Sequence, residues 1–173
     1  MKAKKSSPGM AATQTLMILT AAGAVGILAF WLVREQTRAH QCVRNLKHIY
    51  QAIELYEIDH GRLPSLALYP NDPQHGSDSL LVALYPYGVE EHTGICPGTP
   101  PFTREQGLSY IWNIRLNGQS LSRYGEPKWM LIGINALSDR VRAPHLRGHH
   151  VLYTDGTVRA YREPPPGVRE VLP

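Results

Sequence analysis

The sequence predicts an α+β fold in which a long N-terminal α-helix, transmembrane in its first half, packs on a small antiparallel β-sheet. Three observations predict this fold. Residues 10–33 are predominantly apolar and carry no charge. Residues 34–60 continue without proline or glycine and have helical periodicity. Proline and glycine recur from residue 61 onward, and the short alternating segments between them are typical of β-strands.

The apolar segment, residues 10–33, is long enough to cross a lipid bilayer. As a helix its 24 residues span about 36 Å, and the hydrocarbon core is about 30 Å thick. Trp31 lies near the end of the segment, where an indole suits the membrane interface, and Arg34 ends it. A buried core helix of this length without a charged face is unusual. A secretory signal has a shorter apolar region with a small-residue cleavage site after it, which residues 34–42 do not offer.

The second part of the helix, residues 34–60, is predicted to be amphipathic. Its apolar residues follow at spacings of four and three, which places them in one stripe on one face: Cys42, Leu46, Ile49, Ile53 and Tyr56. Charged residues occupy the opposite face: Arg44, Lys47, Glu54 and Glu57. Gly61 is a natural helix end, and Pro64 follows it. The stripe has to be buried against the remainder of the chain.

That remainder is predicted to be a head domain over residues 61–162. Residues 65–107 are expected to be rich in loops, with one helical turn at residues 79–85. The predicted strands are residues 109–116, 129–134, 150–154 and 157–161. Asp155-Gly156 between the last two predicts a hairpin with a two-residue turn that has positive φ at both positions. The proline-rich tail, residues 163–173, is expected to be loosely ordered.

The positive charge of the chain does not indicate a nucleic-acid partner. The net charge is +4 and the pI is about 9.2, but the basic residues are scattered on both sides of the apolar segment. The chain has no run of five basic residues and no nucleic-acid recognition motif. We therefore predict that these charges lie near a membrane surface.

The two cysteines, Cys42 and Cys96, allow one disulfide in a domain outside the cytoplasm. That bond would close a loop of about 54 residues and stabilise the fold by roughly 4 kcal/mol in the chain-entropy account. Alternatively, Cys42 is a small core residue of the helix stripe. The sequence leaves both interpretations open.

The sequence predicts neither a catalytic site nor a cofactor. It contains no nucleophile, metalloprotease or phosphate-loop motif. His145, His149 and His150 are close in sequence, but neighbours on a strand face opposite sides, so His149 and His150 are poorly placed to share a metal. We interpret these histidines as strand residues, with a metal site from His145, His149 and an acidic partner as the alternative. Asp72 and Asp78 lack the further ligands that a calcium site needs.

Three motifs occur in a fixed order along the chain. The first is a short lysine-bearing leader, residues 1–9, which ends in Gly9 directly before the apolar helix. The second is CVRNLKHI at residues 42–49 with GRLP at residues 61–64. The third is His145, then nine residues, then Asp155-Gly156. Together they resemble the type IV pilin and type II secretion pseudopilin superfamily, most closely the bacterial pilin-like proteins with an H-X9-DG domain.

This resemblance implies processing and assembly. A prepilin peptidase would cleave after Gly9 and leave Met10 as a methylated N-terminus. The subunits would then pack their apolar helices together with other pilin-like subunits. The family usually has glutamate at the fifth mature position, whereas this chain has Gln14, which can accept a hydrogen bond but carries no charge.

The expected protein is a non-catalytic structural subunit, and the expected location is the bacterial inner membrane. A short leader is easily retained in the cytoplasm, so we expect a single pass with the N-terminus cytoplasmic and the C-terminal domain periplasmic or otherwise extracytoplasmic. The alternative is a stand-alone anchored protein that binds a ligand or an envelope partner and never assembles, and the uncharged Gln14 favours it. For the H-X9-DG motif we expect Asp155 and Gly156 to form the turn, and His145 to hydrogen-bond across the hairpin and hold the preceding loop.

Overall fold

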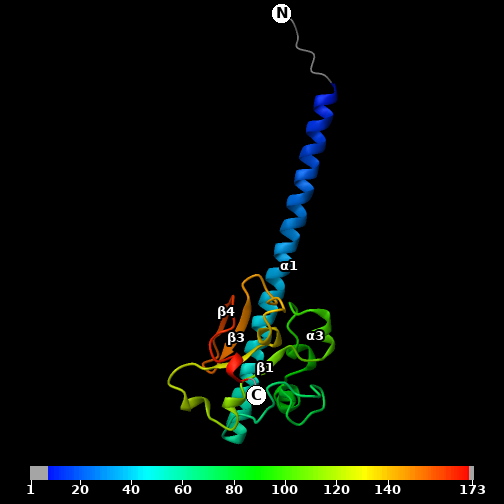
Figure 1. The fold of residues 1–173 in the computed structure, drawn as a ribbon. Coiled ribbons are helices and arrows are strands. Elements are labelled where there is room, and N and C mark those ends of the chain that lie inside the picture. Colours follow the sequence, from blue (N-terminus) through cyan, green and yellow to red (C-terminus); the bar gives the residue numbers. More distant parts are fainter. Residues whose placement is uncertain (1–7, 172–173) are drawn as a thin grey trace, which may run out of the picture. The chain divides into compact units, whose positions relative to one another are not determined.

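The computed structural model of the protein describes residues 8–171, and it describes side chains from residue 13 onward. The chain divides into two compact units, with the boundary between Thr37 and Arg38. Helix α1 (Pro8–His60) runs through this boundary, and the second unit contains the rest of the chain (Figure 1). The predicted α+β class, a long N-terminal helix with a small antiparallel sheet, is confirmed. Most of the predicted leader lies outside the described residues.

The remaining elements of the second unit are short. The helices are α2 (Leu80–Leu84) and α3 (Pro101–Glu105), and the strands are β1 (Tyr110–Trp112), β2 (Trp129–Gly133), β3 (His149–Tyr153) and β4 (Val158–Tyr161). The connections contain the 3₁₀ helices η1 (Tyr85–Tyr87), η2 (Glu91–Gly94), η3 (Ile114–Leu116), η4 (Leu121–Arg123), η5 (Ile134–Leu137) and η6 (Arg169–Val171). The predicted helical turn and all four predicted strands are present. Strand β1 is shorter than predicted because the Asn113 side chain accepts a hydrogen bond from the backbone of Arg115 and starts η3.

In the first unit, α1 exposes its apolar side chains on every side. All side chains of residues 13–34 are exposed, including Leu16, Met17, Ile18, Leu19, Val25, Ile27, Leu28, Phe30, Trp31, Leu32 and Val33. The Thr20 hydroxyl donates to the Met17 carbonyl oxygen at 2.9 Å, so that this polar group is satisfied within the helix. By length and composition, α1 can cross a membrane.

In the second unit, α1 buries one face. Four of the five predicted stripe residues are buried: Leu46, Ile49 and Ile53 are fully buried, and Cys42 is 2% exposed. The fifth, Tyr56, is half-buried and packs against this core. Full burial of each leucine or isoleucine stabilises the fold by about 1.5–3 kcal/mol. Gly61 ends the helix with a φ of +68°.

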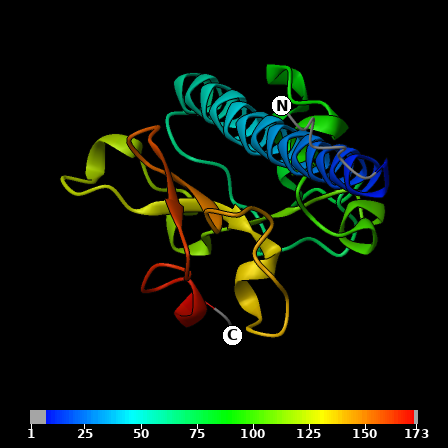
Figure 2. The same ribbon diagram turned by 90° about the horizontal axis from the view of Figure 1, so that it is seen from above.

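The sheet is an antiparallel meander with strand order β1-β2-β3-β4 and an apolar core on each face. The first core lies between the sheet and α1 and includes Trp112, Leu131 and Leu152. The second core lies on the other face and includes Val151. In Figure 2, α1 lies on one side of the sheet and the red tail lies on the other. Alternation along β3 therefore turns His150 toward α1, on the side of Leu152, and turns its neighbours toward the second core.

The tail packs more closely than its proline content predicts. Val168 is fully buried and Val171 is 4% exposed, and both belong to the second core. Residues 163–171 therefore cover the face of the sheet opposite α1, while residues 172–173 lie outside the described residues.

The β3–β4 hairpin is present, but the prediction of a two-residue turn is wrong. The Gly156 amide donates to the Tyr153 carbonyl at 3.0 Å, and the Tyr153 amide donates to the Thr157 carbonyl at 2.9 Å, which leaves a three-residue loop. Gly156 has a φ of +74°, whereas no described residue other than glycine has positive φ. The Asp155 carboxylate accepts hydrogen bonds from the backbone and the hydroxyl of Thr157, which favours a type I turn followed by a left-handed glycine.

This turn is docked against α1. A Cβ atom at Gly156 would lie 2.7 Å from Cε1 of Tyr50. The Tyr50 hydroxyl donates to the carbonyl oxygen of Thr154 at 3.3 Å. Position 156 thus requires glycine for two reasons, the positive φ and the close approach of the tyrosine ring.

The Gly156→Ala substitution is expected to destabilise the head by about 3 kcal/mol, because the left-handed conformation and the overlap with Tyr50 both contribute. Gly118→Ala is the matched control, since Gly118 has a φ of +65° and no atom within 4 Å of the added Cβ. The control should lose only about 1 kcal/mol. Urea unfolding of the full chain in detergent, followed by tryptophan fluorescence, measures both. Equal losses for the two variants would contradict the docking of the turn on Tyr50.

Candidate functional site

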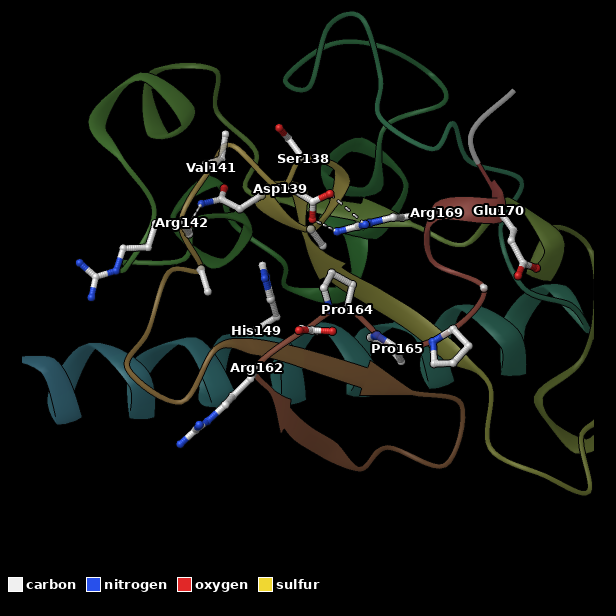
Figure 3. Close-up of a pocket in the computed structure, with 16 residues that line it drawn as sticks. Ser138, Asp139, Val141, Arg142, His149, Arg162, Pro164, Pro165, Arg169 and Glu170 are labelled. Atoms are coloured by element: carbon white, nitrogen blue, oxygen red, sulfur yellow. Dashed lines mark hydrogen bonds and ion pairs between the residues drawn. The ribbon is translucent and has the colours of Figure 1, made fainter.

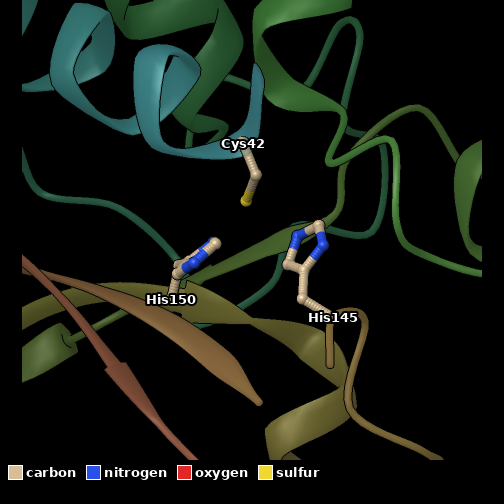
Figure 4. A group of neighbouring side chains, drawn as sticks. All are labelled: Cys42, His145 and His150. Carbon is tan, nitrogen blue, oxygen red and sulfur yellow. The ribbon is translucent and has the colours of Figure 1, made fainter. Parts of the chain in front are cut away.

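Four buried side chains from separate parts of the second unit converge between α1 and the sheet. They are Cys42 on α1, Cys96 in the loop after η2, His145 before β3, and His150 on β3. Figure 4 shows three of them, with Cys42 facing the rings of His145 and His150. We call these four residues the Cys/His cluster.

A buried asparagine on α1 positions the loop that carries Cys96. Asn45 is 5% exposed, and its Nδ2 donates to the carbonyl oxygens of Ile95 at 2.9 Å and of His92 at 3.3 Å. Because an amide group on the buried face of α1 needs partners, the loop backbone supplies them. Cys96 follows directly and is thereby brought next to the helix.

A glycine lets the same loop approach His145. A Cβ atom at Gly98 would overlap the carbonyl oxygen of Pro144 and the imidazole ring of His145. Only a residue without a side chain permits this contact. Gly98 and Asn45 together fix the distance between the loop and its two neighbours, α1 and the segment before β3.

Within the cluster, sulfur and imidazole nitrogen atoms are close to one another. Sγ of Cys96 lies 3.1 Å from Nε2 of His145. Cys42, His145 and His150 each offer one ligand atom, and these atoms all lie within 4.8 Å of one another. The rings of His145 and His150 have centroids 4.7 Å apart. These separations are short enough for the side chains to act on one bound ion.

The two thiols influence each other's acidity, and they differ in pKa. The hydrogen bond with Cys42 lowers the pKa of the Cys96 thiol to about 5, burial opposes this, and His145 lowers it further. The same contact with Cys96, together with burial, raises the pKa of the Cys42 thiol well above its ordinary value. Of the two thiols, Cys96 is the more acidic.

The imidazole of His150 is held neutral. Burial, and after it the neighbouring His145, lower the pKa of His150 to about 4. Its Nδ1 atom is buried and has no hydrogen-bond partner. A neutral imidazole with an unpartnered nitrogen is able to coordinate a metal ion.

The arrangement does not suit nucleophilic catalysis. Cys96 beside His145 has the composition of a Cys–His dyad, but Cys96 is 1% exposed and His145 is 6% exposed. A reactive cysteine needs access to its substrate, and burial of both side chains denies it. The cluster is suited to stabilising the fold.

The structure brings some of the predicted site residues together and separates others. Cys42 and Cys96 come together in the cluster, and both are free thiols in this structure. The disulfide between them stays a prediction. His145 contacts Cys96, a partner that the sequence did not predict. Asp155 and Gly156 lie in the hairpin turn that docks on Tyr50, as described above.

The predicted processing residues lie in the first unit. Gln14 is exposed on α1. Gly9 and Met10 belong to the backbone of α1, and their side chains lie outside the described part of the chain. Cleavage after Gly9 and methylation of Met10 stay predictions.

A second feature is an open, mostly polar groove of about 550 Å³ on the side of the sheet opposite α1 (Figure 3). The ion pair between Asp139 and Arg169 lies at its edge, and His149 reaches into it. Nδ1 of His149 has no hydrogen-bond partner. Burial, and after it the charge of Arg169, lower the pKa of the His149 imidazole. The groove is further lined by Asn135, Ser138, Arg142, Arg162, Glu163 and Glu170.

No family model, curated protein or solved structure matches this chain.

The His145→Ala substitution is expected to destabilise the head by about 2 kcal/mol, because it leaves a cavity and removes the partner of the buried Cys96 sulfur. His92→Ala is the control, since the side chain of His92 is 72% exposed. Urea unfolding of the full chain in detergent measures the difference. A His145→Ala variant as stable as the control would show that the contact with Cys96 contributes nothing.

Proposed function

We propose that the chain is a membrane-anchored, pilin-like structural subunit without catalytic activity. Residues 10–33 anchor it in the bacterial inner membrane as a single pass with a cytoplasmic N-terminus. The head, residues 61–162, lies outside the cytoplasm. Its partners are the membrane, a prepilin peptidase and other pilin-like subunits of a type IV pilus-like or type II secretion-like assembly.

One observation carries this proposal: a single helix has two halves that need different surroundings. The side chains of residues 13–34 are exposed on all sides, so the first half requires lipid or neighbouring apolar helices. Leu46, Ile49 and Ile53 in the second half are fully buried beneath the sheet. An anchor that continues directly into the core of its own head is suited to a subunit that presents the head from a membrane or a filament.

The H-X9-DG residues support a structural role. His145 contacts the loop cysteine, and Gly156 allows the hairpin turn to pack on Tyr50. Asp155 uses its carboxylate to hold the turn through Thr157. Each motif residue thus has a structural role, and none of these roles involves a substrate.

The second candidate is a stand-alone anchored protein whose head binds a ligand or an envelope partner. The groove on the side opposite α1 favours it, because Arg142, Arg162 and Arg169 line an open polar surface there. Gln14 also favours it, since an uncharged residue at this position cannot neutralise the N-terminal amine of a neighbouring subunit.

Mass spectrometry of the N-terminus of the full chain, isolated from membranes of its native host, tests the proposal. The expected mature chain begins at a methylated Met10. A Gly9→Val variant is the matched control and should keep its leader, because the bulky side chain blocks cleavage at that bond. Both forms should stay in the membrane fraction after an alkaline wash, since residues 10–33 anchor them.

Three results would overturn the proposal. An intact Met1 on the membrane-bound chain would show that the leader is not cleaved, and would favour the stand-alone anchor. A chain that carries residues 1–33 and is recovered without detergent in the soluble fraction would contradict both candidates. A chain that begins after residue 33 would identify the apolar segment as a secretory signal.

A further inference from the structure

We propose that Cys42, Cys96, His145 and His150 bind one Zn²⁺ ion in a buried structural site between α1 and the sheet. The site is independent of pilin-like assembly, because all four ligands belong to the second unit of one chain.

The ligand types and their number fit zinc. Two sulfurs and two imidazoles are a common set for a structural zinc ion, which is bound by four ligands in a tetrahedron. With a Zn–S distance of about 2.3 Å and a Zn–N distance of about 2.0 Å, a sulfur and a nitrogen ligand lie about 3.5 Å apart. Cys96 Sγ lies 3.1 Å from His145 Nε2, close to this separation, and the ligand atoms of Cys42, His145 and His150 lie within 4.8 Å of one another.

Burial argues for a structural ion. The four side chains are between 1% and 8% exposed. A catalytic zinc keeps one position open for water or substrate, whereas a closed set of four protein ligands stabilises the fold. The ligands come from α1, from the loop after η2, and from the segment that begins at His145 and enters β3. One ion would therefore cross-link three parts of the second unit.

The two histidines distinguish zinc from a disulfide. A disulfide would use Cys42 and Cys96 and would leave two buried imidazoles beside it. The structure instead places a histidine nitrogen against the Cys96 sulfur, and it leaves Nδ1 of the buried His150 without a hydrogen-bond partner. A buried polar nitrogen without a partner costs free energy, and coordination within the cluster gives the His150 ring a role.

The strand supplies a matched control. His149 and His150 are adjacent on β3, and both are buried. His150 belongs to the cluster on the α1 side, whereas His149 lines the groove on the other side. Only His150 is a proposed ligand, so His149→Ala removes the same side chain from the same strand without touching the site.

The test is metal analysis of the full chain, purified in detergent without chelators. We expect about one zinc ion per chain by mass spectrometry of the metal content. Cys42→Ser and His150→Ala should lower the zinc content at least fivefold, and His149→Ala should retain it. After zinc is replaced by Co²⁺, the wild-type chain should show the visible absorption of a tetrahedral site and a sulfur-to-cobalt charge-transfer band. Both spectral features should be lost in Cys42→Ser.

A measurement on the unmutated chain covers the case in which the variants fail to fold. Modification of the thiols with a mercurial reagent should release the zinc, and a colorimetric chelator should detect it in proportion to the thiols modified. Three results would overturn the proposal. The first is a chain that neither contains zinc nor takes it up from a ZnCl₂ solution. The second is a chain 2 Da lighter than the mass calculated with two free thiols, in which no thiol titrates under denaturing conditions. The third is a His149→Ala variant that loses zinc as His150→Ala does.

Discussion

The burial of one stripe of α1 beneath the sheet is the interaction on which the rest of the head depends. The strands are three to five residues long, and a sheet of this size needs an apolar partner to be stable. Leu46, Ile49 and Ile53 supply that partner on one face. The buried valines of the tail close the other face, so the sheet is covered on both sides.

The same helix explains the spacing of the H-X9-DG motif. His145 lies beside the cluster that includes Cys42, and Gly156 packs on Tyr50. Cys42 and Tyr50 are eight residues apart on α1, which corresponds to about 12 Å along the helix. The first residue of the motif therefore lies in the cluster beside Cys42, and its last residue packs against α1 at Tyr50. His145 and Gly156 are therefore required at their positions for different physical reasons.

Features that depend on local pattern could be predicted from the sequence, and features that depend on contacts between distant residues could not. Periodicity located the α1 stripe and the strands. The turn type was missed because the Asp155 carboxylate accepts two hydrogen bonds from Thr157, and these stabilise the three-residue loop. The packing of the tail was missed because Val168 is hidden among prolines and glycine. The cluster was missed because alternation alone does not show that His150, rather than His149, faces the cysteines.

The central claim is that one helix is stabilised by two different environments. Amide hydrogen exchange of the full chain in lipid nanodiscs, at increasing urea concentration, tests it most directly. The account predicts that residues 42–56 lose protection together with the strands when the head unfolds, while residues 13–33 stay protected by lipid. Loss of protection in both halves at the same urea concentration would contradict it, because the first half would then depend on the head.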